Sequence, residues 1–330
     1  MTDLRVIQLL VKVGKCLALT PFSLTDSKPC RLEKIYKFGI LTVYTVVTIC
    51  TWYTRMVYYA GISKIQLACK VLIDLNAYAH SCYTLVVVKK QQWFTLMHTL
   101  AKIDNPYSQE PHVLSALVPL VAFGVVTLSE MYYWYESFGL ISLCFFFFEV
   151  LRSYCQFFYT IFTCIILRMI LARYRYQNLL CRQKILLTRF KRNFHELTSA
   201  IRIFNELFGW SILLDISVII PRIITLVHFL IRGSKIRFKF KSQNLFLVQN
   251  CELISVLLGI FWISQLCDSI TEECQKLLHF FYTNGVFCDT VLQKPPRFTA
   301  ARYFNIQKST VFSILNIILA YTVVIIQVDL

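Results

Sequence analysis

Acidic side chains are scarce in this chain of 330 residues, which has 18 Asp and Glu against 34 Lys and Arg and a formal net charge of +16. The chain also has no CxxC pair, no HExxH segment and no Asn-x-Ser/Thr sequon. The chain therefore lacks the usual sequence signatures of a zinc site and of a redox site. It also has no His-rich or paired-carboxylate motif that would indicate an enzyme. We therefore expect no catalytic site, no metal and no other cofactor.

Apolar residues, by contrast, make up 57% of the chain and aromatic residues 15%, and the mean hydropathy is +0.58. This composition is too apolar for an ordinary soluble domain. The basic residues lie in short loops between apolar stretches, where the anionic headgroups of an inner leaflet would neutralise them. We therefore expect contact with membrane lipid and none with nucleic acid. The 13 cysteines fall mostly in these stretches or in predicted cytoplasmic loops, which indicates small apolar packing residues.

Seven apolar stretches are long enough to cross a bilayer, which takes about 20 mostly apolar residues. Loops on the side of the N-terminal segment carry 23 Lys and Arg, loops on the other side carry 7, and four more lie inside the stretches. The positive-inside rule then places the N-terminus in the cytoplasm. The predicted fold class is all-α, a polytopic membrane protein with seven transmembrane helices and an extracellular C-terminus. The predicted spans are residues 38–57, 67–88, 113–131, 140–171, 206–231, 245–266 and 309–328.

The sequence between and within the spans also predicts where helices continue, bend and end. A basic segment from Arg173 to Arg192 has no Pro or Gly, so we expect helix to continue through it in the cytoplasm up to Gly209. Pro221 predicts a kink in the fifth span. Residues 268–308 are polar and amphipathic and predict a second structured cytoplasmic region with a turn at Asn284-Gly285.

The N-terminal stretch from Leu4 to Leu19 is apolar but is interrupted by Arg5, Lys12 and Lys15, with no small-residue cleavage site after it. This pattern favours an amphipathic helix at the inner membrane surface over a signal peptide.

The last span has a polar and small-residue stripe. At about 100° per residue, Ser309, Ser313, Asn316, Ala320 and Gln327 fall in a sector about 60° wide, with Val323 and Val324 beside it. One interpretation is a helix that lines an aqueous pore, with a valine constriction and a Gln327 ring near the outer mouth. The other is a stripe of small residues for helix packing. A pore would need several copies of the chain around an axis.

Ionisable residues inside spans are functional candidates by default. Lys70 and Asp74 are four residues apart, and Glu149 and Arg152 are three apart, so each pair could neutralise itself within one helix. Arg222 would need a carboxylate from another helix. A ligand pocket would be built from the outer halves of the second to sixth spans, although interior packing is the alternative for each residue. The candidates for ligand binding are Asp74, Tyr78, Tyr133, Phe146, Glu149, Tyr154, His228, Asn250 and Glu252.

The C-terminal residues resemble the closing signature of the insect gustatory receptor family, within the insect chemoreceptor superfamily. That signature is Thr-Tyr, five apolar residues, then Gln-Phe, and Tyr321 and Gln327 match it at the right spacing. Ala320 replaces the Thr and Val328 replaces the Phe, so the chain looks like a divergent member. Leu19-Thr20-Pro21-Phe22 is similar to the short motif before the first span in these receptors.

The resemblance implies a tetrameric, ligand-gated, non-selective cation channel in the plasma membrane of sensory neurons, as a homo- or hetero-tetramer that detects a small-molecule tastant. It implies that each last helix lines the pore, with Gln327 in it and Val328 where the family has a constriction. Ligand would enter from outside. The chain is then organised as a cytoplasmic N-terminal segment (1–37), six transmembrane helices with the ligand pocket (38–266), a cytoplasmic anchor segment (267–308) and the pore-lining helix (309–330).

A seven-helix receptor that signals through G proteins is the alternative. Such receptors have an extracellular N-terminus and usually an acidic-Arg-Tyr triplet at the inner end of the third span. In this chain the nearest triplet is Ala172-Arg173-Tyr174, which lacks the acid.

Overall fold

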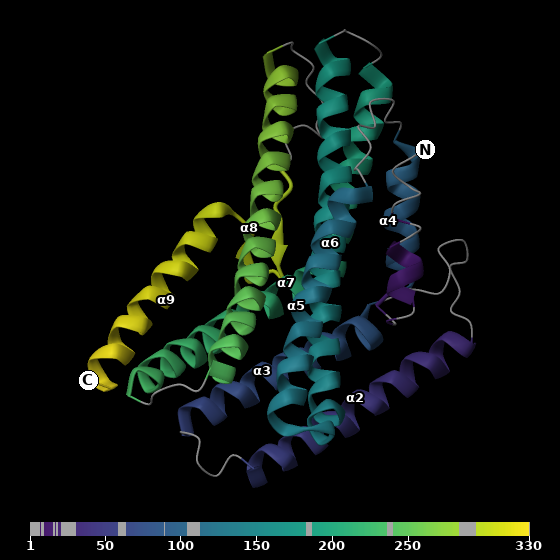
Figure 1. The fold of residues 1–330 in the computed structure, drawn as a ribbon. Helices are drawn as coiled ribbons and strands as arrows, with labels where there is room; N and C mark the ends of the chain where they lie inside the picture. The colour runs from purple at the N-terminus through teal and green to yellow at the C-terminus, as the bar shows by residue number, and fades with distance from the viewer. Residues whose placement is uncertain are drawn as a thin grey trace.

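The computed structural model describes residues 7, 10–15, 17, 19–20, 31–58, 64–88, 90–103, 113–182, 187–235, 240–283 and 295–329. The described chain is almost entirely helical, as the composition predicted (Figure 1). Its helices are α2 (Arg31–Tyr58), α3 (Lys64–Cys82), α4 (Lys90–Lys102), α5 (Val113–Phe138), α6 (Leu140–Arg182), α7 (Leu187–Lys235), α8 (Phe240–Thr283) and α9 (Lys308–Asp329). A π-helix η1 (Tyr83–Val87) extends α3, and strands β1 (Thr299–Ala300) and β2 (Phe304–Asn305) precede α9.

Three helices are much longer than the spans predicted for them. α6, α7 and α8 have 43, 49 and 44 residues, and α7 begins well before the predicted span and continues past Gly209 without a break. Hydropathy marks only the part of a helix that fits the bilayer, whereas the helix continues into the polar residues beyond it, which contain no Pro. Figure 1 shows that the end of α6, the start of α7 and the end of α8 project together beyond α2, α3 and α9.

Four helical stretches in the described residues are long and apolar enough to cross a membrane: residues 31–53, 150–181, 192–227 and 250–283. The bent pair formed by residues 67–87 and 90–102 raises the number to five, and shorter apolar helices cover 117–133 and 308–321. The count of seven spans and the orientation of the two termini therefore stay predictions.

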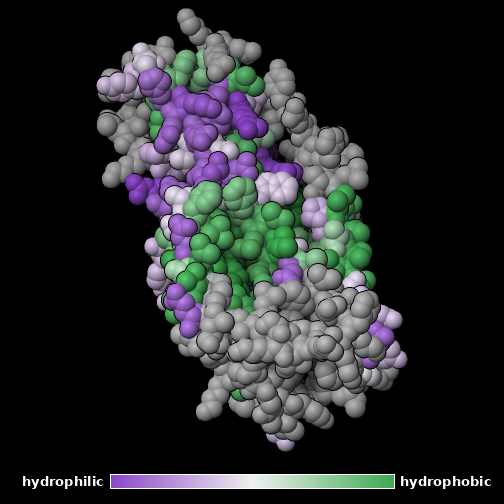
Figure 2. All heavy atoms as spheres, turned by 60° about the vertical axis from the view of Figure 1, so that its left-hand side comes forward, coloured by the Kyte–Doolittle hydropathy of each residue, from purple (hydrophilic) through white to green (hydrophobic). Residues whose placement is uncertain are grey.

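The exposed surface fits a lipid environment. Figure 2 shows apolar side chains gathered in a band below a polar cap. Along α2, Phe38, Ile49 and Tyr53 are 72%, 61% and 72% exposed. A water-soluble monomer rarely exposes so much contiguous apolar surface, whereas a bilayer covers it without cost.

Helix α4 was not expected from the sequence, which predicted no element between the spans 67–88 and 113–131. Its apolar positions Trp93, Leu96 and Leu100 are fully buried, and Trp93 lies 5.2 Å from Phe162 and 5.4 Å from Phe208 between ring centroids. The helix is amphipathic and too polar to register as a span, so hydropathy alone did not reveal it.

The N-terminal helix packs against protein. Ile7, Leu10 and Val11 are buried in the main hydrophobic core, while Lys12 and Val13 are exposed. The helix is amphipathic as expected, but the described part of its apolar face contacts this core and not a lipid surface.

The two short strands form an antiparallel hairpin in which Thr299 pairs with Asn305 and Ala300 with Phe304. Ala301 and Arg302, at the turn, have positive φ angles of 48° and 67°. The sequence offered no signal for this hairpin, because such turns usually carry Asn or Gly at these positions.

Candidate functional site

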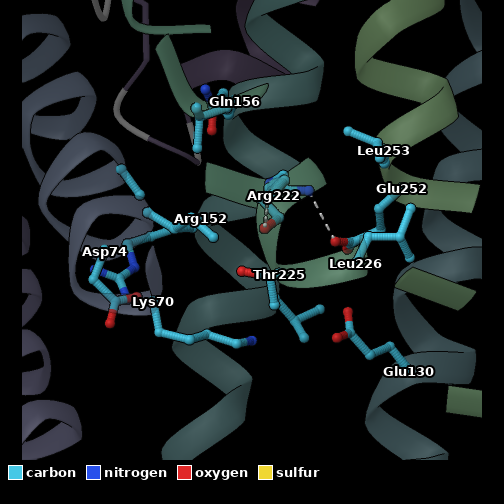
Figure 3. A pocket seen from close by; sticks show the side chains of 15 residues that line it. Lys70, Asp74, Glu130, Arg152, Gln156, Arg222, Thr225, Leu226, Glu252 and Leu253 are labelled. Atoms are coloured by element: carbon cyan, nitrogen blue, oxygen red, sulfur yellow. Dashed lines mark hydrogen bonds and ion pairs between the residues drawn. The ribbon is translucent and has the colours of Figure 1, made fainter. Parts of the chain in front are cut away.

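A cavity lies among α3, α5, α6, α7 and α8, close to the start of α6 and α8 and to the end of α5 and α7 (Figure 3). On the predicted orientation this is the outer half of the membrane. The cavity has a volume of about 70 Å³, whereas pockets for drug-sized ligands are about 300–1,000 Å³. In this conformation it therefore admits only a small molecule. Its charged lining residues are Lys70, Asp74, Glu130, Arg152, Arg222 and Glu252.

An ion pair between α3 and α6 occupies one wall of the cavity. Arg152 Nη2 lies 3.7 Å from Asp74 Oδ1, and both side chains are at least 97% buried, with exposures of 3% and 2%. Arg152 Nη1 also donates to Thr48 Oγ1 of α2 at 3.0 Å. The sequence suggested that Asp74 and Arg152 each pair within their own helix, and it missed this contact across the bundle.

A second ion pair joins α7 to α8 at the other wall. Arg222 Nη1 donates to Glu252 Oε2 at 3.2 Å, and Arg222 Nη2 lies 3.4 Å from Ser153 Oγ of α6. This pair confirms that Arg222 takes a carboxylate from another helix. Figure 3 shows the two ion pairs on opposite sides of the cavity.

A buried carboxylate lies next to this site. Asp215 of α7 accepts hydrogen bonds from Gln156 Nε2 at 2.5 Å and from Thr160 Oγ1 at 3.1 Å, both on α6. Gln156 also lines the cavity. The network fixes α6 against α7 about two turns of α7 away from the Arg222 pair.

The residues predicted for ligand binding divide into three groups. Asp74 and Glu252 line the cavity. Four other candidates do not line the cavity, namely Tyr78, Tyr133, Tyr154 and Asn250. The Tyr78 hydroxyl forms a hydrogen bond with Thr45 Oγ1 at 2.9 Å, and Asn250 is half-buried. The Tyr133 ring packs against Tyr132, and the Tyr154 ring packs against Phe123. The side chains of Phe146, Glu149 and His228 lie outside the described residues.

The sequence analysis overlooked four polar residues of the cavity. Glu130, Ser153, Gln156 and Thr225 line it together with the charged pairs. The available signal was the helical register: Ser153 and Gln156 lie one and four positions after Arg152, so Gln156 shares its face.

Helix α9 makes little contact with the rest of the described chain. Its buried residues are Val311 and Ile318, with Ile314 partly buried between them. At about 100° per residue, the predicted stripe lies roughly opposite this buried face. Its side chains are all exposed in the described structure, namely Ser313, Asn316, Ala320, Val323, Val324 and Gln327, while the side chain of Val328 is outside the described residues.

The hairpin before α9 is held by α7. Asn205 Nδ2 donates to the Arg297 carbonyl at 2.8 Å, and Asn205 Oδ1 accepts from Thr299 N at 3.1 Å. Gly209, one turn further along α7, lies so close that a Cβ there would be 2.9 Å from Ala301 N and 3.0 Å from Thr299 O. Glycine is therefore required where the two backbones meet.

Two further hydrogen bonds join α8 to the start of α9 and η1 to α7. On α8, Asp268 Oδ2 accepts a hydrogen bond from Lys308 N at 3.0 Å, at the first turn of α9. A carboxylate at this position is stabilising because the helix N-terminus has unpaired N–H groups and a partial positive charge. On α7, the Glu206 carbonyl accepts a hydrogen bond from the Tyr83 hydroxyl of η1 at 2.7 Å. Helix α7 thus reaches both the cavity, through Arg222, and the hairpin that precedes α9.

Comparison with known proteins adds the decisive observation. The family model described as 7tm Chemosensory receptor matches residues 7–330. The chain belongs to this chemosensory receptor family. The match confirms the resemblance carried by Tyr321 and Gln327, and it makes the receptor a multi-pass membrane protein.

Solved structures agree with the fold. The receptor is similar to the insect olfactory receptor OR5 from Machilis hrabei, with 14% sequence identity and a TM-score of 0.76 over 99% of this chain and 100% of that one. It is similar to the same protein in complex with eugenol, with 12% identity and a TM-score of 0.74 over 99% and 100% of the two chains. No curated protein sequence matches the receptor.

Proposed function

We propose that the receptor is a subunit of a ligand-gated, non-selective cation channel that detects small chemicals. Four copies, of this chain or of this chain with related subunits, would surround a pore lined by α9. The cavity beside Arg152 and Arg222 is the ligand site, in the unit formed by residues 38–266. The long ends of α6, α7 and α8, together with residues 267–308, form the cytoplasmic anchor between subunits.

The placement of α9 carries this proposal. Its narrow apolar face packs on α7 and α8, and the polar stripe with Asn316 and Gln327 lies on the opposite side. Polar groups that face hydrocarbon cost several kcal/mol each when unsatisfied, so this stripe needs water or other protein. A central pore between four copies of α9 supplies water to every stripe at once.

The cavity supports the sensory part of the proposal. It is enclosed by five helices and combines apolar walls with convergent charged groups, as ligand sites do. The similar olfactory receptor has been solved in complex with eugenol, a small molecule. We assign the receptor to taste or contact detection, in the plasma membrane of sensory neurons, because its closing signature with Tyr321 and Gln327 resembles that of the gustatory members.

Gating would follow the connection through α7. A ligand that binds the open state more tightly than the closed one shifts the population toward the open state. Arg222 and Asp215 couple α7 to the cavity, and Asn205 and Gly209 couple it to the hairpin before α9. Rotation or translation of α7 would then displace α9.

Replacing Gln327 with Glu tests the pore. A ring of four carboxylates attracts cations, so we expect the ligand-evoked current to become several-fold more sensitive to block by divalent cations. The measurement is the current–voltage relation of the full receptor at graded Ca²⁺ concentrations. The same change at Gln307, which precedes α9, is the matched control and should leave block unaltered. An unchanged current in the Gln327→Glu variant would contradict a pore position.

A further inference from the structure

The described residues that line the cavity carry both signs of charge. Three cationic side chains, Lys70, Arg152 and Arg222, line it with three anionic ones, Asp74, Glu130 and Glu252. Figure 3 shows the Lys70 ammonium and the Glu130 carboxylate directed toward each other across the space, and the two Arg–carboxylate pairs on either side of it. The described lining residues therefore present both signs of charge to any molecule inside.

The ion pairs leave hydrogen-bonding capacity unused. Within the described structure, Oε1 of Glu252 and Nε of both Arg152 and Arg222 are buried and have no hydrogen-bond partner. The Glu252 side chain is 92% buried, with an exposure of 8%. The Arg152–Asp74 contact, at 3.7 Å, is also longer than a hydrogen bond. Buried charged groups with unused donors and acceptors are costly, so a ligand that satisfies them gains affinity.

We infer that the cavity binds a small zwitterion, a molecule that carries an ammonium and a carboxylate on neighbouring carbons, as an α-amino acid does. This inference rests on the proposed ligand site and names its ligand class. The ligand carboxylate accepts hydrogen bonds from Arg152 and Arg222, and its ammonium donates to Glu252. The volume of about 70 Å³ restricts the side chain of such a ligand to a few atoms.

Other ligand classes fit this lining less well. An apolar molecule leaves the buried donors and the Glu252 oxygen without partners, which costs affinity for each group. An anion leaves the buried Glu252 oxygen without a donor, and a cation leaves the buried Arg152 and Arg222 donors without an acceptor. A neutral polyol forms hydrogen bonds in which only the receptor group is ionised, so it lacks the attraction between opposite charges that a zwitterion adds.

Binding of matched probes to the purified full-length receptor in lipid nanodiscs tests the inference. Glycine and L-alanine are the zwitterions, propionate and ethylamine carry one charge each, and glycerol is the neutral polyol. We expect the two zwitterions to bind at least roughly tenfold more tightly than the other three probes, because only they satisfy both signs of charge. Equal or tighter binding of glycerol, propionate or ethylamine would overturn the zwitterion assignment.

Two variants locate the binding. Glu252→Gln removes the acceptor for the ammonium and should weaken L-alanine binding by roughly tenfold or more. Ala77→Leu fills the cavity without changing any charge and should abolish the same binding, which keeps the test valid if the first variant folds poorly. Glu196→Gln breaks a partly exposed ion pair with Lys102 outside the cavity and is the matched control, with unchanged binding.

Ligand-evoked currents distinguish a failure of the zwitterion inference from a failure of the proposed ligand site. If the zwitterions fail to bind but Ala77→Leu abolishes the current evoked by some other compound, the proposed ligand site stands and the zwitterion class is wrong. If Ala77→Leu leaves every ligand-evoked current unchanged, the cavity is not the ligand site and both proposals for it are wrong.

Discussion

Replacing Asp74 with Asn is expected to destabilise the receptor by about 3–5 kcal/mol, because the buried Arg152 guanidinium loses its carboxylate. Both side chains are almost fully buried, and the pair joins α3 to α6 at the wall of the cavity. An unpaired guanidinium at this depth has neither water nor a counter-charge to stabilise it. The measurement is the midpoint of unfolding of the purified receptor and its yield as a monodisperse species.

The double variant Asp74→Asn with Arg152→Gln shows whether the unpaired charge causes the loss of stability. Removing both charges should recover most of the lost stability, since replacing a buried ion pair by neutral groups is often tolerated. Glu196→Gln, which breaks the partly exposed pair with Lys102, should change stability by less than about 1 kcal/mol. A single Asp74→Asn variant as stable as the unmodified receptor would show that Arg152 does not depend on this carboxylate.

Replacing Gly209 with Ala is expected to reduce the maximal ligand-evoked current by roughly tenfold while ligand binding is retained. The new Cβ would lie within 3.0 Å of backbone atoms of Thr299 and Ala301, so the hairpin must move away from α7. Overpacking of this kind costs about 1–3 kcal/mol, and about 1.4 kcal/mol corresponds to a tenfold change in an equilibrium. A displaced hairpin transmits less of the movement of α7 to α9.

The same substitution at Gly39 is the matched control. Gly39 lies in α2, and apart from its own helical backbone and chain neighbours no atom of the described residues lies within 4 Å of the position of a Cβ. Alanine there should stabilise the helix by up to about 1 kcal/mol and leave the current unchanged. If Gly209→Ala also stabilised the receptor and kept the full current, the contact with the hairpin would have no role in gating.

Patterns that repeat along one helix were readable from the sequence. The stripe of α9 is derived from the 3.6-residue period alone. Ser313, Asn316 and Ala320 are exposed, but so are the apolar Phe312 and Leu319, and the pore position of the stripe stays a prediction. The apolar stretches predicted an all-helical fold for the same reason, because each helix satisfies its own backbone within the bilayer.

Contacts between different helices could not be predicted from the sequence. Arg152 and Asp74 are 78 positions apart, and Arg222 and Glu252 are 30 apart, so no local spacing indicates that they pair. The candidate pocket residues Tyr78 and Tyr154 lie on the right helices but have partners elsewhere. The hairpin at 299–305 escaped prediction because its strands have two residues each and its turn has no glycine.

Cysteine accessibility along α9 tests most directly whether its polar stripe lines the pore. Ser313→Cys, Asn316→Cys and Ala320→Cys are compared with Ile318→Cys on the buried face, and the unmodified receptor with its native cysteines gives the background. A cationic, water-soluble thiol reagent should block the current at the three stripe positions, faster when ligand is present, and should not act at Ile318. Block at Ile318 with none at the stripe positions would place the pore elsewhere.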